Sequence, residues 1–455
     1  MDLTIETLRE RVRGTVISRQ DDGFEQSRSV YNAMIDRRPQ VVVRCVNAGD
    51  AVATVDYARE NGLDLAVRGG GHSVPGFGTC DDGVVLDLTP MHGVRVSPGG
   101  RTARAEGGTT WGDIDAATHA FGLATTGGLI STTGIGGLTL GGGIGHLARG
   151  LGLSCDNLVS ADVVTAAGEL VVADERQHED LFWALRGGGG NFGVVTSFEY
   201  RLAPVRDIYG GLIFFEVDQA PNVLRAFREI ITRAPEEFSA FPAFQIAPPL
   251  PFIPENRHGD VLIAIVACWA GPMDAGPAVV QPLREIAPIV AEHVGPTPYP
   301  RLNSAFDALV PPGLQHYWKA NFVVELTDEM IAAHARFGPK VPALNSTVHI
   351  YPIDGACHRV AADATAFAYR DANFAAVIAG MWPNPADNEA NIAWVRDYYA
   401  ATAPHSEEGG YVNFMAGDDQ DRIKANYKGN YDRLVQVKRE YDPQNLFHLN
   451  QNIRP

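Results

Sequence analysis

The sequence has little positive charge and few cysteines. Its 37 lysines and arginines stand against 54 aspartates and glutamates, which gives a formal net charge of −17. No run of basic side chains could follow a phosphate backbone, so a nucleic acid is not an expected partner. The five cysteines are scattered and form no Cys-x-x-Cys pair. This pattern argues against a disulfide framework and against a zinc site. We therefore expect that the protein binds no metal and resides in a reducing cytoplasm.

Long hydrophobic runs are also missing. Residues 1–11 alternate charged with apolar side chains, unlike a secretion signal, and no stretch elsewhere is long and apolar enough to cross a bilayer. We therefore expect a cytoplasmic protein that binds no membrane. With 455 residues, of which 45% are hydrophobic, the chain can form packed cores, and its length suggests about two or three domains.

Glycine, by contrast, is abundant, with 48 residues, many of them clustered in the first part of the chain. Between residues 40 and 90, strand-like and helix-like patterns alternate. A helix pattern ends at Asn61-Gly62, a strand follows at 65–67, and another strand lies at 84–88. The glycine-dense segment 127–152 is not expected to form a stable helix, but it can bring main-chain N–H groups close to a ligand.

The pattern predicts three regions along the chain. Residues 1–205 contain the glycine clusters, together with a predicted hairpin at 163–172, a short helix at 179–186 and a strand at 194–200. Residues 206–404 show longer strands and amphipathic helices instead. Residues 405–455 return to short motifs, and their last helix is expected to stop at Asp442-Pro443.

The glycine clusters suit a ligand with phosphates that are bound by main-chain N–H groups rather than by basic side chains. A dinucleotide fits this description. The ordinary dinucleotide fingerprint does not, because Gly134-Ile-Gly136-Gly137 lacks the third glycine and follows no clear strand, and a Walker A loop is absent. The phosphates therefore require a different glycine architecture.

Several motifs in fixed order resemble those of one enzyme group. They are Arg68-Gly-Gly-Gly-His-Ser73, Gly134-Ile-Gly-Gly-Leu-Thr-Leu-Gly-Gly-Gly143, Gly152-Leu-Ser-Cys-Asp-Asn157, Leu185-Arg-Gly-Gly-Gly-Gly-Asn-Phe-Gly-Val194, Tyr411-Val-Asn-Phe414 and Asn450-Gln-Asn452. Together they resemble the berberine bridge enzyme-like FAD-linked oxidases of the vanillyl-alcohol oxidase superfamily, and most of all the bacterial members of the 6-hydroxynicotine oxidase type.

The resemblance implies an α+β fold with three parts. Residues 1–205 correspond to a PCMH-type FAD-binding domain of two subdomains. Residues 206–404 correspond to an α+β substrate cap with an antiparallel sheet. Residues 405–455 correspond to the C-terminal segment, which returns to the FAD-binding domain.

The resemblance also implies that FAD is bound covalently through His72. A neutral imidazole is a suitable nucleophile near pH 7; the alternative is a loop histidine that only touches phosphate. Members with a second covalent bond carry a cysteine at the position of Ile130, and isoleucine cannot form a thioether. Cys155 follows the glycine cluster and reads as a buried structural thiol. We therefore expect a single covalent bond, together with a lower flavin redox potential and a less open pocket than in doubly linked members.

Other cofactor contacts are carried over from the family motifs, although any single glycine could be a plain turn. We expect the pyrophosphate turn at Arg68, Gly69, Gly70, Gly71, Ser73 and Gly76. A second wall is expected at Thr132, Gly136, Gly137, Gly142 and Gly143. We expect a main-chain contact at Gly193 and Val195, and polar groups near the flavin ring at Asn450 and Asn452. His146 and Trp111 read as core or rim residues.

Tyr411 is the candidate catalytic base, since a tyrosine at the start of the Tyr-x-Asn motif has this role in several relatives. Asn413 is expected on the same strand face, where it could support a phenolate; the alternative is a buried structural tyrosine. His349 and Tyr351, two residues apart on a predicted strand, are the candidate substrate contacts. The segment 366–370 is also expected to face the flavin ring.

The predicted reaction is oxidation of a small alcohol, amine or phenolic compound. Hydride passes to the flavin, and oxygen then accepts the electrons and forms hydrogen peroxide. A dehydrogenase that reacts poorly with oxygen and a non-catalytic flavin-binding protein are the alternatives. Thr133 occupies the position that controls oxygen access in relatives and is neither the usual permissive nor the usual blocking residue. The sequence is compatible with a homodimer.

Overall fold

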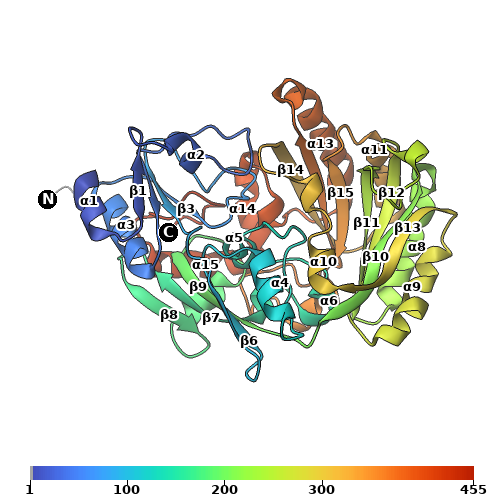
Figure 1. The fold of residues 1–455 in the computed structure, drawn as a ribbon, viewed down its shortest axis with the longest axis horizontal. Coiled ribbons are helices and arrows are strands. Elements are labelled where there is room, and N and C mark those ends of the chain that lie inside the picture. Colours follow the sequence, from blue (N-terminus) through green and yellow to red (C-terminus); the bar gives the residue numbers. More distant parts are fainter. Residues whose placement is uncertain (1–3) are drawn as a thin grey trace.

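The computed structural model describes residues 4–455, except for the side chains of residues 420 and 421. The described chain forms three β-sheets with helices packed around them (Figure 1). Residues 15–201 supply the two smaller sheets, and residues 207–382 supply the large one. This is the mixed α+β architecture that the sequence predicts. None of the helices in the described chain is long and apolar enough to cross a membrane.

The first sheet has the strand order β1-β2-β4-β3, in which only the β1–β2 pair is antiparallel. Its strands and neighbouring helices are β1 (Thr15–Ser18), β2 (Val41–Arg44), β3 (Leu65–Arg68), β4 (Val84–Asp87), α1 (Ile5–Arg11), α2 (Phe24–Arg28) and α3 (Ala48–Glu60). Because side chains alternate along a strand, Val41 and Val43 pack with α1 and α3 while Val42 faces the other side. The carboxyl end of β3 leads directly into the loop that carries His72.

The second sheet is antiparallel, with the order β5-β6-β9-β7-β8. Its strands and the helices of this part of the chain are β5 (Val94–Ser97), β6 (Thr102–Glu106), β7 (Leu158–Val164), β8 (Leu170–Asp174), β9 (Val194–Arg201), α4 (Trp111–His119), α5 (Ile135–Leu140), α6 (Ala148–Leu151) and α7 (Glu179–Leu185). Trp111 and Phe198 belong to the core between this sheet and its helices.

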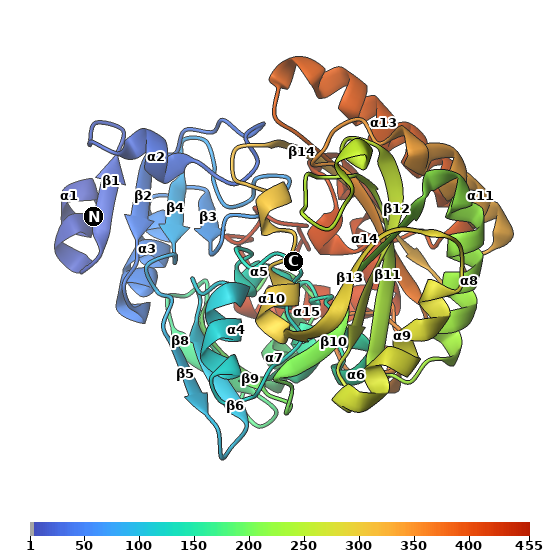
Figure 2. The same ribbon diagram turned by 45° about the vertical axis from the view of Figure 1, so that its right-hand side comes forward.

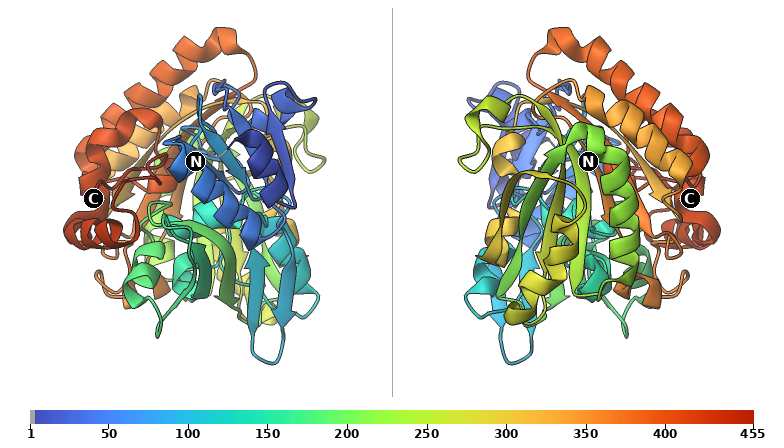
Figure 3. Two further views of the ribbon diagram at one scale, coloured as in Figure 1. Left: turned by 90° about the vertical axis from the view of Figure 1, so that its left-hand side faces the viewer. Right: turned by 90° about the vertical axis from the view of Figure 1, so that its right-hand side faces the viewer.

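The large sheet is antiparallel, with the order β13-β10-β12-β11-β15-β16-β14. Its strands are β10 (Asp207–Glu216), β11 (Phe238–Ile246), β12 (Val261–Trp269), β13 (Ile289–Pro298), β14 (Gln315–Val323), β15 (Thr347–Pro352) and β16 (Phe374–Trp382). Four helices cover its outer face: α8 (Ala220–Arg233), α9 (Gly276–Arg284), α11 (Asp328–Phe337) and α13 (Asn388–Thr402). The right-hand view of Figure 3 looks onto this outer side. The inner face is turned toward the smaller sheets (Figure 2).

We call residues 207–382, which include the large sheet, the cap region. Its short helices α10 (Tyr299–Asn303) and α12 (Ala356–Arg359) contact α4 and α6, respectively, and so join it to the first part of the chain. The C-terminal helices α14 (Ile423–Tyr427) and α15 (Tyr431–Tyr441) lead the chain back, and α15 packs against α7. Phe447 completes the core of the first sheet.

Most predicted elements are confirmed, with two corrections. Segment 127–152 forms the short helices α5 and α6, because N–H groups and carbonyls four residues apart still pair there despite the glycines. Residues 412–414 form a 3₁₀ turn, so the expected strand face shared by Tyr411 and Asn413 does not exist. The chain passes from the second sheet to the large sheet between β9 and β10. The domain limits at 205 and 404 stay predictions.

Candidate active site

A cavity of about 350 Å³ lies between the inner face of the large sheet and the loops of the two smaller sheets. We call it the central cavity. Its volume falls within the range of roughly 300–1,000 Å³ that is usual for small-molecule sites. One wall consists of the loop 68–78 and residues 128–140, and the opposite wall comes from β11, β14, β15 and β16. Residues far apart in the sequence therefore meet around one space.

His72 lies on the wall of the central cavity, in the loop that follows β3. Its ring stacks on Tyr31, with ring centroids 3.7 Å apart. Its Nε2 lies 3.1 Å from the Thr132 hydroxyl and its Nδ1 lies 3.4 Å from the Thr133 hydroxyl. Burial lowers the pKa of His72 to about 4, so the imidazole is neutral near pH 7 and retains a nucleophilic nitrogen.

The loop around His72 offers main-chain N–H groups to the cavity. In the described part of the chain, no acceptor pairs with the N–H groups of residues 69–73. A Cβ on Gly70 would lie 2.3 Å from the main-chain nitrogen of Gly134, and Gly71 has a φ of +71°, so both positions favour glycine. Consecutive unpaired N–H groups of this kind bind anions such as a diphosphate.

Arg68 also lines the cavity, but its guanidinium points elsewhere. It donates to the carbonyls of Ser27 and Ser29 at 2.6 and 3.0 Å, and it lies 3.3 Å from the Asp87 carboxylate. Its charge therefore holds the N-terminal segment in place. The diphosphate of a dinucleotide would be bound by the glycine loop and not by this side chain.

Other predicted cofactor residues reach the cavity wall from four separate segments. They are Ser73, Gly136, Gly137, Gly193, Val195 and Asn450. At Gly137 no atom lies within 4 Å of where a Cβ would stand. The side-chain nitrogen of Asn450 donates to the carbonyls of Gly190 and Phe447, while its buried oxygen pairs with no described residue. An unpaired buried acceptor at the wall fits a ligand that carries N–H groups, as a flavin ring does.

The remaining predicted cofactor residues do not line the central cavity: Gly76, Thr132, Gly142, Gly143 and Asn452. Thr132 still contacts His72 through its hydroxyl. Gly142 has a φ of +126° and lies beside Phe367, behind the wall, because the turn after α5 carries the chain away from the cavity. The proposed cofactor contacts of these residues stay predictions.

Tyr411 lies behind the wall as well. Its hydroxyl accepts hydrogen bonds from the Gly143 N–H and from the side-chain nitrogen of Asn413, each at 2.8 Å. The side chain is buried, and burial raises its pKa. Asn413 does line the cavity, and it also donates to the Leu138 carbonyl. The predicted contact between Tyr411 and Asn413 is therefore present, whereas the role of Tyr411 as a base stays a prediction.

The strand β15 places both predicted substrate residues on the cavity wall. His349 and Tyr351 face the cavity with Thr347, whereas Val348 and Ile350 face the outer core. Nδ1 of His349 and the Tyr351 hydroxyl share a hydrogen bond, and Nε2 of His349 has no partner among the described residues. Burial, with the neighbouring His146 ring, lowers the pKa of His349 to about 3, and burial raises that of Tyr351.

Sequence reasoning missed Tyr31, Trp318 and Phe414, which line the cavity beside the predicted residues. Trp318 alternates with His316 on β14, which is the same spacing that identified β15. Tyr31 stands in an irregular loop and carries no such signal. Its main-chain N–H donates to Gly71, and its hydroxyl donates to the Val310 carbonyl, so Tyr31 links the His72 loop to the cap region.

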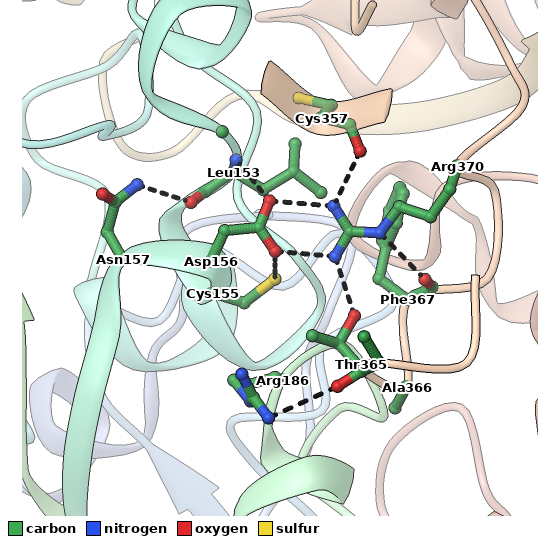
Figure 4. A network of polar contacts seen from close by, with 12 residues as sticks. Leu153, Cys155, Asp156, Asn157, Arg186, Cys357, Thr365, Ala366, Phe367 and Arg370 are labelled. Atoms are coloured by element: carbon green, nitrogen blue, oxygen red, sulfur yellow. Dashed lines mark hydrogen bonds and ion pairs between the residues drawn. The ribbon is translucent and has the colours of Figure 1, made fainter. Parts of the chain in front are cut away.

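A buried ion pair joins the Gly152–Asn157 motif to the cap region. Arg370 contacts both oxygens of Asp156, at 2.8 and 2.6 Å, and also donates to the hydroxyl of Thr365 and the carbonyls of Cys357 and Phe367 (Figure 4). This pairing turns residues 366–370 away from the cavity and corrects the prediction that they face the flavin ring. Cys155 is fully buried beside Asp156, as expected of a structural thiol.

The residues that the structure describes contain no group of three or more His, Cys, Asp or Glu side chains that could hold a metal ion. Each of the five cysteines is free and buried. The central cavity with its glycine loop is therefore the candidate active site.

Comparison with known proteins defines the class. Residues 39–174 match the family model described as an FAD binding domain, and residues 410–454 match the model described as berberine and berberine-like. The fold and the glycine loop around His72 are therefore those of an FAD-linked oxidoreductase.

The relatives define the family. An FAD-linked oxidoreductase of Dictyostelium discoideum is 32% identical over 98% of this chain and 96% of its own length. The (R)-6-hydroxynicotine oxidase of Paenarthrobacter nicotinovorans is 29% identical over 98% and 97%. The chain belongs to the berberine bridge enzyme-like family of FAD-linked oxidoreductases.

Solved structures agree with this assignment. The crystal structure of 6-hydroxy-D-nicotine oxidase from Arthrobacter nicotinovorans superposes with a TM-score of 0.87, at 29% identity and 98% coverage of both chains. A berberine bridge enzyme-like protein of Physcomitrella patens superposes with a TM-score of 0.86 at 21% identity over 99% of both chains, which shows the fold alone.

Proposed function

We propose that this FAD-linked oxidoreductase is an oxidase whose flavin is held by one covalent bond, to His72. The observation that carries the proposal is the position of a neutral, partly buried imidazole on the cavity wall, next to the unpaired N–H groups of residues 69–73. FAD bound there supplies the acceptor for a substrate hydride and passes the electrons to oxygen, which yields hydrogen peroxide.

The residues of this chain divide the work between two walls. The glycine loop and Asn450 would hold the diphosphate and the flavin ring. The wall formed by β14, β15 and β16 would bind and orient the substrate. The side chains of Phe306, Trp318 and Phe414 restrict access of water to the space between them.

A single covalent bond is supported by two residues. Ile130 lines the central cavity at the position of the second linkage in other members, and its side chain cannot bond to a flavin. Cys155 is fully buried and contacts Asp156, and burial raises the pKa of its thiol well above the usual value. A protonated thiol is a poor nucleophile.

Anaerobic mixing with a panel of alcohols, phenols and amines, followed by air, tests the oxidase. An oxidase loses its yellow colour on mixing, regains it within seconds in air and releases one peroxide per turnover. Bleaching that persists in air but reverses with an artificial electron acceptor indicates a dehydrogenase and contradicts the proposal. If no member of the panel bleaches the flavin, a protein that only binds flavin is favoured instead.

A further inference from the structure

The central cavity has almost no charge on its walls. Among its lining residues in the described chain, Arg68 alone is charged; its two terminal nitrogens contact Ser27, Ser29 and Asp87, and its Nε is buried without a partner among these residues. An ammonium group moved from water into such a space would lose its hydration without gaining a carboxylate. The cavity therefore disfavours a cationic amine.

On the cavity wall formed by β11, β14, β15 and β16, most polar side chains are paired within the protein. Gln245 donates to the Leu344 carbonyl, Asn345 to the Leu309 carbonyl and Thr347 to the Phe244 carbonyl. A sugar, with several hydroxyl groups, would find few free partners here, and each unpaired hydroxyl would lose affinity. The wall suits a ligand with few polar groups.

Aromatic rings lie on this wall beside the apolar side chains of Val377, Ala379 and Met381 on β16. Phe414 packs edge-on against Trp318, with centroids 5.9 Å apart, and lies 6.0 Å from the Tyr351 ring. Phe306 lines the same space. Rings arranged in this way favour a flat apolar ligand, which can stack on a face or meet an edge.

Two polar groups on this wall have hydrogen-bonding capacity left: the indole N–H of Trp318, which has no partner among the described residues, and the hydrogen-bonded pair of Tyr351 and His349. Of the two, only the pair can accept a proton. Tyr351 has His349 as its hydrogen-bond partner, and Nε2 of His349 is buried without one among the described residues. Both residues are more than nine-tenths buried and line the cavity. A phenol paired to an imidazole can accept a hydrogen bond and pass a proton on.

We propose that the central cavity takes an uncharged aromatic alcohol, whose hydroxyl proton is accepted by Tyr351 while the proton of Tyr351 moves to Nδ1 of His349. This inference rests on the proposed function, because the C–H bond of the alcohol breaks and its hydride, which carries both electrons, would go to the flavin. The substrate O–H bond and the Tyr351 O–H bond break, and new bonds form at Tyr351 oxygen and at His349 nitrogen. The alcohol becomes an aldehyde or ketone.

His349 is suited to this step because it begins neutral, since burial holds its pKa at about 3. A weak base suffices, since loss of hydride turns the alcohol into a protonated carbonyl, which is a strong acid. Tyr351 touches the substrate and is therefore a catalytic residue. His349 acts through Tyr351 and is a positioning and proton-accepting residue.

The test uses the flavin-loaded enzyme, the variants Tyr351→Phe and His349→Gln, and one matched control. Tyr398 shares a 2.8 Å hydrogen bond with the buried His334 in the same way, but on the outer side of the large sheet. Tyr398→Phe therefore removes the same chemical group away from the cavity. Retention of the flavin spectrum and of far-ultraviolet circular dichroism shows that each variant folds.

The first readout is binding without turnover, by the change in flavin absorbance when phenol is added. Tyr351→Phe should weaken phenol binding by about fivefold to tenfold, because one neutral hydrogen bond is lost. His349→Gln, which removes the ring that orients the Tyr351 hydroxyl, should weaken it less. Tyr398→Phe should match the wild type. Equal phenol affinity in the wild type and in Tyr351→Phe overturns the proposal.

The second readout is anaerobic bleaching by benzyl alcohol and by benzylamine, which have the same shape and differ in charge. Benzyl alcohol should reduce the flavin faster, and Tyr351→Phe should slow the reduction at saturating alcohol by about a hundredfold or more. Faster bleaching by benzylamine overturns the inference but leaves the oxidase intact. If neither compound bleaches the flavin, the oxidase is in doubt, and the phenol measurement still decides the role of Tyr351.

Discussion

Removal of Arg370 tests how the cap region is joined to the flavin-binding part of the chain. Arg370→Met keeps the apolar stem of the side chain but deletes its five donors. Asp156 then keeps the Leu153 N–H at 2.9 Å and the Cys155 thiol, and its negative charge stays buried. Three further acceptors, on Thr365, Cys357 and Phe367, lose a donor as well.

The size of the effect follows from burial. The side chains of Arg370 and Asp156 are 3% and 7% exposed, so solvent cannot replace the lost partner. Breaking a buried pair of this kind costs about 3–5 kcal/mol. At roughly 2 °C per kcal/mol, the melting temperature should fall by roughly 6–10 °C. The double variant Asp156→Leu/Arg370→Met leaves no unpaired charge and should recover much of this loss.

The assay is thermal unfolding at low protein concentration, followed by circular dichroism. Arg359→Met is the control, because Arg359 pairs with Glu236 at the surface, where the two side chains are 60% and 42% exposed. An exposed pair contributes about 0–1 kcal/mol, so this variant should melt within roughly 2 °C of the wild type. If Arg370→Met melts no lower than Arg359→Met, the reasoning about the buried pair is wrong.

Three further predictions concern single residues. If Tyr351 is the base, Tyr411→Phe should leave the rate of flavin reduction by benzyl alcohol within about threefold of the wild type, because the Tyr411 hydroxyl lies behind the cavity wall. Stopped-flow measurement of flavin reduction across the pH range checks this. A loss of about a hundredfold would show that Tyr411 is the base. Cys155→Ser should leave the flavin on the peptide that contains His72, and peptide mass mapping of the variant would show otherwise if Cys155 carried it. Burial raises the pKa of Asp115 from 3.8 to about 7, so the folded protein holds a proton that the unfolded chain releases, and stability should fall as the pH rises from 4 to 7. Asp115→Asn should remove this fall and stabilise the protein at pH 8 by ~4 kcal/mol at most, as measured by urea unfolding at pH 5 and pH 8.

The parts of the site that could be predicted from the sequence are those set by local patterns. His72 lies in the six-residue motif Arg68–Ser73 between two strands, and the structure explains the glycines at positions 70 and 71 by a close approach and a positive φ. The alternation of side chains along β15 placed His349 and Tyr351 on one face, and the structure turns that face to the cavity. Each of these inferences needs only a few neighbouring residues.

The parts that could not be predicted depend on contacts between distant segments. Asp156 and Arg370 are 214 residues apart, and their pairing decides which way residues 366–370 face. Tyr411 belongs to the right motif, but the turn at 412–414 and the Gly143 N–H draw its hydroxyl behind the wall. Tyr31 stacks on His72 from an irregular loop. None of these arrangements leaves a periodic or compositional signal.

The covalent flavin on His72 is the central claim, and acid precipitation tests it most directly. The wild-type protein, loaded with FAD and precipitated in trichloroacetic acid, should give a yellow pellet. Proteolysis of that pellet should yield one flavin-bearing peptide, which contains His72. His72→Ala should fold, bind FAD reversibly and release all of it into the supernatant. A colourless wild-type pellet, or a flavin on any other peptide, would contradict the account.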